Sequence, residues 1–375
     1  MSEIKFSNFI NEDGSGGPDL VGVTTFTSPY YFVPPSGTTA QRPSGEGLAP
    51  GMLRFNTDIG RLEVWRGDHW ATILGESPTL DGGARGLFAA GQINPTGNTN
   101  TIDYITISTL GNAITFGTLV NGARHTPGSC ASSTRGIIAG GSGAGNAIDF
   151  ITISSTGNSA DFGDLTQARN DIAGFSNQTR GIFGGGYVGP TVNTIDYITI
   201  ASTGNAVDFG DTLTVVQAAG GCASSTRGII AGGGAPGNSN VIQFVTISTI
   251  GNATDFGDLT LARGSLNAGC SNAVRGLFAG GYAPGDQNVI DFITIATTGN
   301  ASDFGDLSVN RSQAAAASSA TRGIFAGGIG GPAPRGKLNT IDYVTIMSTG
   351  NAIDFGDLTV IRSALSGLSN AHGGL

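Results

Sequence analysis

The chain has 375 residues, and its 63 glycines and 14 prolines exceed the usual share of turn-forming residues in globular proteins. Only 12% of the residues are charged and the formal net charge is −9, which argues against a protein that holds the phosphate backbone of a nucleic acid. No run approaches the ~18 apolar residues that cross a bilayer, and residues 1–14 lack the features of a signal peptide, so we expect neither membrane insertion nor export by the general secretory route.

The N-terminal region differs in kind from the rest of the chain. Residues 1–40 have no period and contain Gly14-Ser15-Gly16-Gly17-Pro18, so we expect an irregular anchor that becomes ordered on a partner. Residues 41–75 contain three strand-like runs, and we expect a small β-meander there that acts as a docking module. The runs are Met52–Asn56, Arg61–Trp65 and Trp70–Ile73. Residues 76–84 are interpreted as a linker.

Residues 85–375 are made of six copies of one repeat. An Arg-Gly pair, two apolar residues and a glycine-rich pair recur every 45 to 50 residues, at Arg85, Arg135, Arg180, Arg227, Arg275 and Arg322. Each copy continues with a variable loop, an IDYITI-like run, the turn STGN, the string DFGDL, an A-R-x-x-x-A stretch and SSxTRG. A repeat of this length indicates one supersecondary unit that must pack on its neighbours.

Each repeat predicts four short β-strands. The IDYITI-like runs are β-branched and aromatic, and they are apolar in both phases, as expected for a strand covered on both faces. The Gly-Gly pairs end a second strand where a neighbouring backbone comes close. Four strands repeated six times favour an all-β, six-bladed β-propeller over a solenoid, which needs caps at both ends. The surplus strand after Ile361 is expected to complete the blade that begins at Arg85.

The repeat resembles the kelch repeat. The shared order is Arg169-Asn170-Asp171, an apolar strand, Gly-Gly, a variable loop, Ile195-Asp196-Tyr197 and then Phe209. The chain has phenylalanine where kelch repeats favour tryptophan, but an aromatic residue between blades is retained. These phenylalanines are Phe116, Phe162, Phe209, Phe256, Phe304 and Phe355. The resemblance implies that the A-R-x-x-x-A strand is innermost, around a central channel.

A second resemblance covers about 33 residues of the N-terminal region. The strings Arg42-Pro43-Ser44, Gly51-Met52-Leu53-Arg54-Phe55-Asn56-Thr57, Leu62-Glu63-Val64-Trp65 and Trp70-Ala71-Thr72-Ile73 resemble a module that recurs in bacteriophage tail-fibre and other virion appendage proteins. The resemblance implies a place in the virion and contacts between the N-terminal region and other virion proteins. Fibre-type anchors are often homotrimers, so a trimer is one expectation.

Several motifs that suggest chemistry have simpler structural interpretations. Asp-Phe-Gly occurs five times without the other kinase motifs, and one aspartate pair supplies too few oxygens for calcium, so we expect the aspartates to cap turns. The pairs are Asp161/Asp164, Asp208/Asp211, Asp255/Asp258, Asp303/Asp306 and Asp354/Asp357. Arg66-Gly67-Asp68 is interpreted as a turn.

The few cysteines and histidines do not indicate a metal or catalytic centre. Cys130, Cys222 and Cys270 share one repeat position with apolar residues, and we expect them to be small buried groups. The histidines, His69, His125 and His372, are not in register, so no metal or other cofactor is expected.

Two sets of arginines recur in nearly every copy. One set is Arg135, Arg180, Arg227, Arg275 and Arg322, and the other is Arg124, Arg169, Arg263, Arg311 and Arg362. Residues present in all copies usually serve the fold, so we expect these arginines to pair with Asp149, Asp196, Asp291 or Asp342, or with loop carbonyls.

The loop after Gly-Gly breaks the repeat, because it holds between 6 and 12 residues of very different content. In a propeller these loops share one face, and variable surface loops are where recognition is expected. The groups there that can stack on a sugar or hydrogen-bond to one are Tyr187, Asn238, Tyr282, Asp286, Gln287 and Asn288.

The leading hypothesis is a bacteriophage virion structural protein, such as a tail fibre, spike or knob, whose non-catalytic propeller binds a glycan or protein on the host surface. One alternative is a polysaccharide depolymerase, which needs two close carboxylates. The non-repeated acids Asp81 and Asp286 have no evident partner for this chemistry. A head or collar decoration protein without a receptor role is a second alternative, and an intracellular kelch adaptor is a third.

Overall fold

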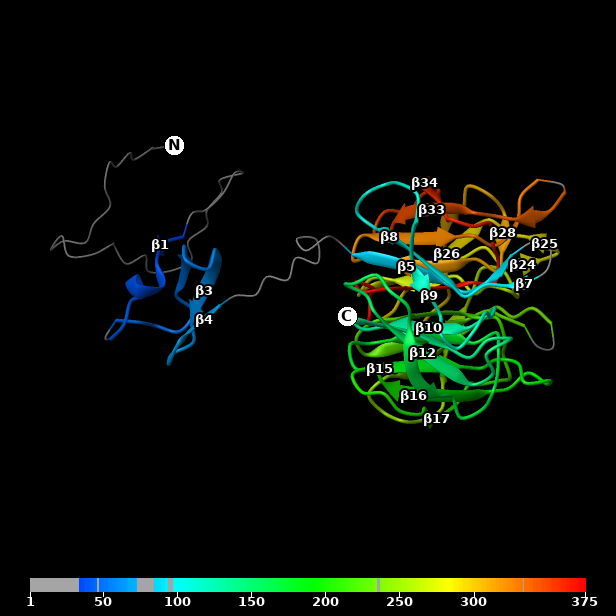
Figure 1. Ribbon diagram of the computed structural model, residues 1–375, viewed down its shortest axis with the longest axis horizontal. Coiled ribbons are helices and arrows are strands. Elements are labelled where there is room, and N and C mark those ends of the chain that lie inside the picture. Colours follow the sequence, from blue (N-terminus) through cyan, green and yellow to red (C-terminus); the bar gives the residue numbers. More distant parts are fainter. Residues whose placement is uncertain (1–33, 46, 73–83, 94–96, 235–236, 333) are drawn as a thin grey trace. The chain divides into compact units, whose positions relative to one another are not determined.

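The computed structural model describes residues 34–45, 47–72, 84–93, 97–234, 237–332 and 334–375. The chain divides into two compact units, Met1–Ser77 and Pro78–Leu375, which are described separately (Figure 1). Regular structure is almost all β, and the linker expected at 76–84 lies almost wholly outside the described residues. No helix in the described ranges is long and apolar enough to cross a membrane.

The first unit contains one four-stranded sheet. Its strands are β1 (Ser36–Gly37), β2 (Leu53–Asn56), β3 (Arg61–Trp65) and β4 (Trp70–Thr72), with β1 parallel to β2 and the other neighbours antiparallel. Strands β2, β3 and β4 lie where the sequence predicts them. The sheet begins earlier than residue 41, however, since β1 and the 3-10 helix η1 (Thr39–Gln41) fall in the segment expected to be irregular. The Arg66-Gly67-Asp68 string is a turn, as predicted, in which Arg66 N–H donates to the His69 carbonyl.

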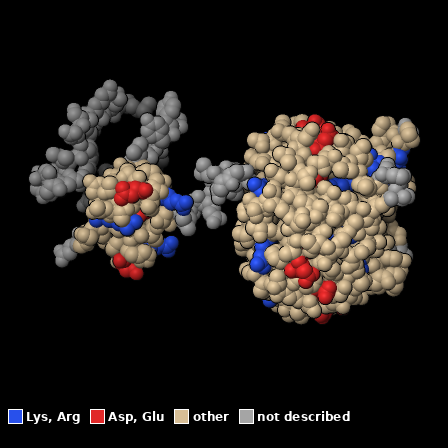
Figure 2. All heavy atoms as spheres, in the orientation of Figure 1, with Lys and Arg blue, Asp and Glu red and all other residues tan. Residues whose placement is uncertain are grey.

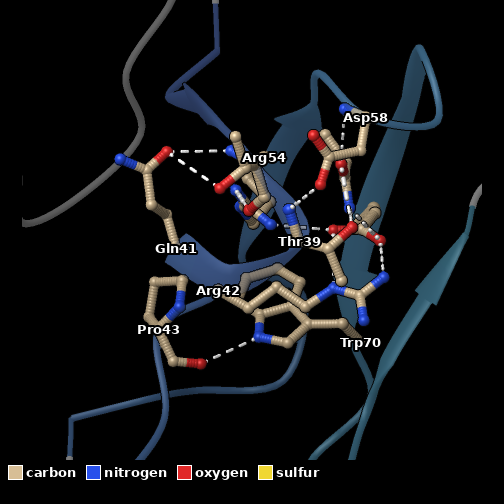
Figure 3. A network of polar contacts seen from close by, with 10 residues as sticks. Thr39, Gln41, Arg42, Pro43, Arg54, Asp58 and Trp70 are labelled. Carbon is tan, nitrogen blue, oxygen red and sulfur yellow. Dashed lines mark hydrogen bonds and ion pairs between the residues drawn. The ribbon is translucent and has the colours of Figure 1, made fainter.

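The sheet of the first unit is polar on its buried side. Glu63 is fully buried and accepts hydrogen bonds from Arg42, from Arg54 Nη1 (3.0 Å) and from Asn56 Nδ2 (3.1 Å). The bond from Arg42 lowers the pKa of Glu63 below its usual range. Figure 3 shows this network, with Trp70 Nε1 donating to the Pro43 carbonyl at its edge.

The opposite side of the same sheet is apolar and exposed. Leu53 and Phe55 alternate with the buried residues along β2, and Leu62 pairs with Phe55 across the ladder. Leu53 is 46% exposed and Leu62 is 38% exposed. Within the described ranges 34–45 and 47–72, no apolar side chain is buried. The unit therefore exposes the apolar face of its sheet, which in a small domain is usually covered by another element.

Within its described part, the second unit forms six antiparallel sheets of four strands, numbered one to six in chain order (Figure 1). Sheet one is β35 (Ser366–Ser369), β5 (Arg85–Ala89), β8 (Thr101–Thr106) and β9 (Ile114–Thr118). Sheet two is β10 (Gly128–Ala131), β11 (Arg135–Ala139), β12 (Ala147–Thr152) and β13 (Ala160–Asp164). Sheet three is β14 (Ala173–Ser176), β15 (Arg180–Gly184), β16 (Thr194–Thr199) and β17 (Val207–Asp211).

The remaining three sheets repeat this order. Sheet four is β18 (Gly220–Ala223), β19 (Arg227–Ala231), β20 (Val241–Thr246) and β21 (Thr254–Asp258). Sheet five is β22 (Gly269–Ser271), β23 (Arg275–Ala279), β26 (Val289–Thr294) and β27 (Ser302–Asp306). Sheet six is β29 (Ala315–Ser318), β30 (Arg322–Ala326), β33 (Thr340–Thr345) and β34 (Ile353–Asp357). This all-β arrangement is consistent with a β-propeller.

The variable loops, numbered after the sheets that contain them, add short extra strands. Loop one holds β6 (Gln92–Ile93) and β7 (Gly97–Asn98), and loop five holds β24 (Tyr282–Ala283) and β25 (Gly285–Asp286). Loop six pairs β31 (Ile329–Gly330) with β32 (Gly336–Lys337) and with β28 (Arg311–Ser312). Figure 1 shows β7, β24, β25 and β28 together on one side of the second unit.

The hydrophobic core lies between neighbouring sheets. Each cluster of buried residues joins two sheets that follow each other, and one cluster joins Phe88 of sheet one to Phe355 of sheet six. The phenylalanine of each DFG string meets an aromatic ring of its own sheet edge to face, as Phe209 does with Tyr197 at 5.9 Å. Phe116 of the Thr-Phe-Gly string in sheet one meets Tyr104 in the same way. The prediction of an aromatic residue packed between sheets is confirmed, and it explains why the β8-type strands are buried on both faces.

The first strand of each sheet begins later than the sequence predicts. In sheet two the A-R-x-x-x-A-like stretch is 123–128, whereas β10 starts at its last residue, Gly128. Thr126 has φ of 52°, a left-handed conformation that cannot continue an extended strand. Arg124 therefore lies in the connection before the strand. These first strands, called the inner strands, lie side by side in the order β10, β14, β18, β22, β29 and β35, and β35 lies beside β10.

The C-terminal strand belongs to the first sheet, where the sequence predicts it. β35 pairs antiparallel with β5, with Ser366 opposite Ala89 and Ser369 opposite Gly86. The segment before β35 is also fixed to sheet one, since Arg362 forms a buried ion pair with Asp103 (2.9 Å).

The STGN turn of each sheet binds the outer strand of the preceding sheet. The turn glycine donates its N–H to the DFG phenylalanine carbonyl, and the turn asparagine accepts a backbone N–H from that strand, as Asn205 does from Asp164 (3.0 Å). A Cβ on Gly163 would lie 2.5 Å from the Gly204 carbonyl oxygen, so the DFG glycine permits this approach. The prediction that the DFGD aspartates cap turns is wrong. They lie on the outer strands, and the capping group is the asparagine of the next sheet.

The two arginine sets have different partners. Each Arg-Gly arginine packs over an aromatic ring of its own sheet and donates to a carbonyl of the next sheet, as Arg85 does to Ile153 (2.8 Å). Arg322 of sheet six donates in the same way to Ile107 of sheet one (2.9 Å). The second set forms buried ion pairs within a sheet, namely Arg124–Asp149, Arg169–Asp196, Arg263–Asp291, Arg311–Asp342 and Arg362–Asp103. Both predicted kinds of partner are therefore found, one for each set.

Sheet four lacks both members of this ion pair. Val216 occupies the arginine position and Gln243 the aspartate position, and Gln243 Oε1 accepts a hydrogen bond from Leu213 N–H (2.8 Å). Replacing only the arginine or only the aspartate would leave an uncompensated buried charge, which is strongly destabilising. The replacement of both residues in sheet four avoids this cost.

Candidate functional site

The variable loops form one connected face of the second unit, called the loop face. In every sheet the residue after Gly-Gly pairs through its backbone with the residue after the buried-set arginine or its counterpart, as Tyr187 does with Asn170. Side chains then join neighbouring loops. Asn98 Nδ2 donates to the Ser142 carbonyl (3.0 Å), and Lys337 Nζ donates to the Ile93 carbonyl (2.9 Å). The loop face is therefore a linked surface rather than a set of independent loops.

The six inner strands line two cavities, together called the channel, and a ring of backbone hydrogen bonds lies at the end of the channel on the loop face. Its members, called the mouth ring, all have positive φ: Thr126, Asp171, Ala218, Ser265, Gln313 and Ala364. Asp171 N–H donates to the Thr126 carbonyl (2.9 Å), Thr126 N–H donates to the Ala364 carbonyl (2.7 Å), and the series continues through all six sheets. In sheet five the donor is the adjacent Leu266 N–H. The ring fixes the geometry of the inner strands that follow it.

Asp171 is the acidic member of the mouth ring. Burial raises its pKa to about 6, and a contact with the Thr126 hydroxyl acts in the opposite direction. The other five positions hold neutral residues. A carboxyl group that is costly to ionise and breaks the repeat marks a candidate functional position. Asp171 is not conspicuous in the sequence because this position of the repeat has no common residue type, and the shared strings lie on either side of it.

A second cluster lies where loops five and six meet. Asp286 on β25 accepts hydrogen bonds from Arg335, one of them from Nη2 (2.7 Å), and from Ser312 Oγ (2.8 Å). The Arg335 guanidinium also lies over the ring of Tyr282, 5.7 Å from its centroid. Arg335 binds Asp286 from a loop 49 residues away, which the sequence does not suggest, but this partner is an arginine and not the second carboxylate that hydrolysis needs. Asp81 lies outside the described residues.

The predicted site residues are not all brought together. Tyr282 and Asp286 are cross-strand neighbours, and Asn238 of sheet four donates from Nδ2 to the Tyr282 carbonyl (2.8 Å). Gln287 folds back on its own hairpin and donates to the Gly285 carbonyl (3.0 Å). Asn288 has its carbonyl oxygen bound to Leu307 N–H. Tyr187 lies on the same face but in the loop of sheet three, and it is 42% exposed.

The channel is too small for a sugar. Its two cavities have volumes of about 50 and 30 Å³, and a water molecule needs at least ~10–15 Å³ on the same measure, so each has room for a few waters. The larger cavity is lined by all six inner strands and by His372. Binding of a larger ligand therefore has to use the loops rather than the channel.

The C-terminal tail enters the end of the channel opposite the loop face. His372 Nε2 contacts the Ala131 carbonyl (2.9 Å), and Gly374 N–H donates to His372 Nδ1 (3.1 Å). This pattern assigns the ring proton to Nε2. Burial lowers the pKa of His372, so the ring is neutral around pH 7. Gly373 N–H donates to the Ser271 carbonyl, which fixes the tail to sheet five.

The cysteines and histidines lie as separate groups. Cys130, Cys222 and Cys270 are free thiols and are buried, as predicted, beside the channel. Burial raises the pKa of the Cys270 thiol to about 12. Among the residues that the structure describes, no three histidine, cysteine, aspartate or glutamate side chains gather as a metal site.

Comparison with known proteins gives a structural relative. No family model matches the chain, and no curated protein matches it. Among solved structures, the chain is similar to the one described as "Structure of YjhT", with a TM-score of 0.55 and 12% sequence identity. The similarity covers 65% of this chain and 87% of that chain. At this identity the likeness concerns the fold alone.

Proposed function

We propose that the protein is a bacteriophage virion appendage, a tail fibre, spike or knob, in which a closed six-bladed kelch-like β-propeller binds the host surface without catalysis. The observation that carries the proposal is where the repeated and the variable residues lie. Residues that recur in each repeat form contacts within and between sheets. Residues that differ between repeats gather on the loop face, where the exposed Tyr187 and Tyr282 lie.

Closure of the ring is supported by β35, which follows sheet six in the chain and completes sheet one. Three kinds of contact also join sheets six and one: Arg322 donates to Ile107, Gly111 N–H donates to the Phe355 carbonyl, and Ala364 N–H donates to the Gln313 carbonyl in the mouth ring. Each of these three contacts has the same form as those between the other neighbouring sheets. Radial repetition of this kind leaves only short outer edges unpaired.

Attachment to the virion is supported by the first unit. Its sequence resembles the appendage module, and its sheet exposes Leu53 and Leu62 on an apolar face. Such a face fits another virion protein, or the same unit of a second copy in a homotrimer. Weak contacts at several loop faces would then act together in adsorption.

The test uses particles with and without the protein. Mass spectrometry of purified particles should find the chain, and particles lacking it should adsorb more slowly to host cells. Particles with Leu53→Asp and Leu62→Asp should carry less of the protein, since the apolar face would no longer dock. Unchanged adsorption, assembly and particle composition without the protein would contradict the proposal.

A polysaccharide depolymerase is the second candidate, and Asp171 is the observation that favours it. A carboxyl group with a raised pKa is suited to act as a general acid, although hydrolysis also requires a second carboxylate beside it. Incubation with host polysaccharide separates the two functions. Release of sugars by the wild-type protein, and its loss in Asp171→Asn, would support the enzyme, while binding without release would support the appendage.

A further inference from the structure

Tyr282 is an exposed aromatic residue on a rigid base. It is 45% exposed, and it lies in the β24–β25 hairpin that turns at Pro284, with Gly285 of β25 at φ of 104°. Its backbone exchanges two hydrogen bonds with Gly264, of 2.7 and 2.9 Å. Asn238 donates to its carbonyl from the neighbouring sheet. The backbone that carries the side chain is therefore fixed before binding, which lowers the entropy cost of binding.

Arg335 is held over this ring, and its hydrogen bonds to the described residues leave some of its N–H donors unused. Nε and Nη2 donate to the two carboxylate oxygens of Asp286, and Nη2 also donates to Ser312 Oγ (3.1 Å). Asp286 is almost covered, with 5% of its side chain exposed, whereas 49% of the Arg335 side chain is exposed. Among the described residues these bonds use Nε and Nη2, so the two N–H groups of Nη1 are available to a ligand. Asp286 acts as a positioning residue that holds the guanidinium plane.

A half-exposed aromatic ring beside fixed planar donors matches the chemistry of a sugar. The C–H face of a pyranose can pack on the part of the Tyr282 ring that the Arg335 guanidinium leaves open, and its hydroxyl oxygens can accept the Nη1 hydrogens of Arg335. The charge of Arg335 is compensated by Asp286, which favours a neutral sugar over an acidic one. Figure 2 views the second unit with the loop strands at its edge, and few charged residues lie on the side that it shows.

We propose that Tyr282 and Arg335 bind a neutral pyranose of a host-surface polysaccharide, a proposal that rests on the host-binding function proposed above. The repeat supplies its own control. Tyr187 occupies the same repeat position in sheet three and is 42% exposed. Arg335 lies over Tyr282, whereas no arginine among the described residues lies over Tyr187. The site therefore uses one tyrosine of the two.

The experiment measures binding of the full-length protein to immobilised polysaccharides and to host cells. Neutral dextran, mannan and galactan form one arm, and polygalacturonate and polysialic acid form the other. The wild type should bind in the neutral arm. Tyr282→Ala and Arg335→Ala should each bind about tenfold or more weakly, while Tyr282→Phe and Tyr187→Ala should stay within about twofold. Far-UV circular dichroism and thermal unfolding confirm that each variant is folded.

Several results would overturn the proposal. Equal losses in Tyr282→Ala and Tyr187→Ala would indicate diffuse binding by the whole loop face, and binding confined to the acidic arm would indicate a different ligand class. If the wild type and Tyr282→Ala adsorb equally to host cells and neither binds a neutral polysaccharide, the sugar site is wrong while the host-binding function stands. If the protein is absent from particles and binds no host cells, the proposed function fails. Tyr282-dependent binding in the neutral arm would still support the sugar site in that case.

Discussion

Replacing Asp171 by asparagine should stabilise the second unit, in a way that depends on pH. Burial raises the pKa of Asp171 from 3.8 to about 6, so the folded chain binds a proton more readily than the unfolded chain. One pKa unit corresponds to ~1.4 kcal/mol, and the shift therefore amounts to about 3 kcal/mol. Between about pH 4 and pH 6 the contribution of Asp171 to the stability should fall as pH rises, because the carboxyl group of the unfolded chain releases its proton first.

Asparagine has nearly the same size and no charge, so it avoids this cost. Asp171→Asn should be more stable than the wild type by up to about 3 kcal/mol near pH 7.5, and the difference should vanish near pH 3.5. Chemical unfolding followed by far-UV circular dichroism at a series of pH values is the appropriate assay. Tryptophan fluorescence would not report on this unit, since Trp65 and Trp70, the two tryptophans of the chain, lie in the first unit.

A surface aspartate provides the control. Asp208 is exposed, and Asp208→Asn should change the free energy of unfolding by no more than about 0.5 kcal/mol. A stability difference between Asp171→Asn and the wild type that does not change with pH would refute the reasoning. So would an asparagine variant that is less stable than the wild type near neutral pH.

Three further variants test the contacts that hold the second unit together. Arg169→Val should lower the free energy of unfolding, measured in urea, by about 3–5 kcal/mol because it leaves the buried Asp196 unpaired. Adding Asp196→Gln, which copies the residues of sheet four, should recover most of this loss. No recovery would show that the two charges are not coupled. Gly210→Ala should lower the melting temperature more than Gly204→Ala. At Gly210 the added Cβ would lie 2.7 Å from the Gly251 carbonyl, whereas at Gly204 it would meet nothing within 4 Å. Equal effects would mean that positive φ alone explains both glycines. Leu368→Asp should lower the free energy of unfolding by about 2–4 kcal/mol and broaden the calorimetric transition, because it places a charge on the buried side of β35. An unchanged transition would mean that β35 does not stabilise sheet one.

Strand content and chain-terminal pairing could be predicted because they depend on local strings. The β-branched runs, the Gly-Gly pairs and the surplus segment after Ile361 each indicate a strand or its end, and the structure has strands there. The start of each inner strand could not be predicted in this way. It depends on the left-handed residue of the mouth ring, whose backbone partner belongs to another sheet.

Contacts between repeats explain most of what the sequence left open. The DFG glycine and the STGN asparagine are conspicuous in each copy, yet their reason lies in the neighbouring sheet and needs the ring geometry. The pairing of Arg335 with Asp286 joins two irregular loops that have no shared pattern. The joint replacement by Val216 and Gln243 was visible in the sequence, and it becomes informative once the ion pair in the other sheets is known.

A cryo-electron microscopy reconstruction of particles that carry the protein tests the account most directly. We expect residues 34–72 in contact with other virion proteins, a closed ring of six sheets with β35 beside β5 and β10, and the loop face accessible to host cells. Particles without density for this chain, a ring that is open between β34 and β35, or a loop face buried against the particle would contradict it.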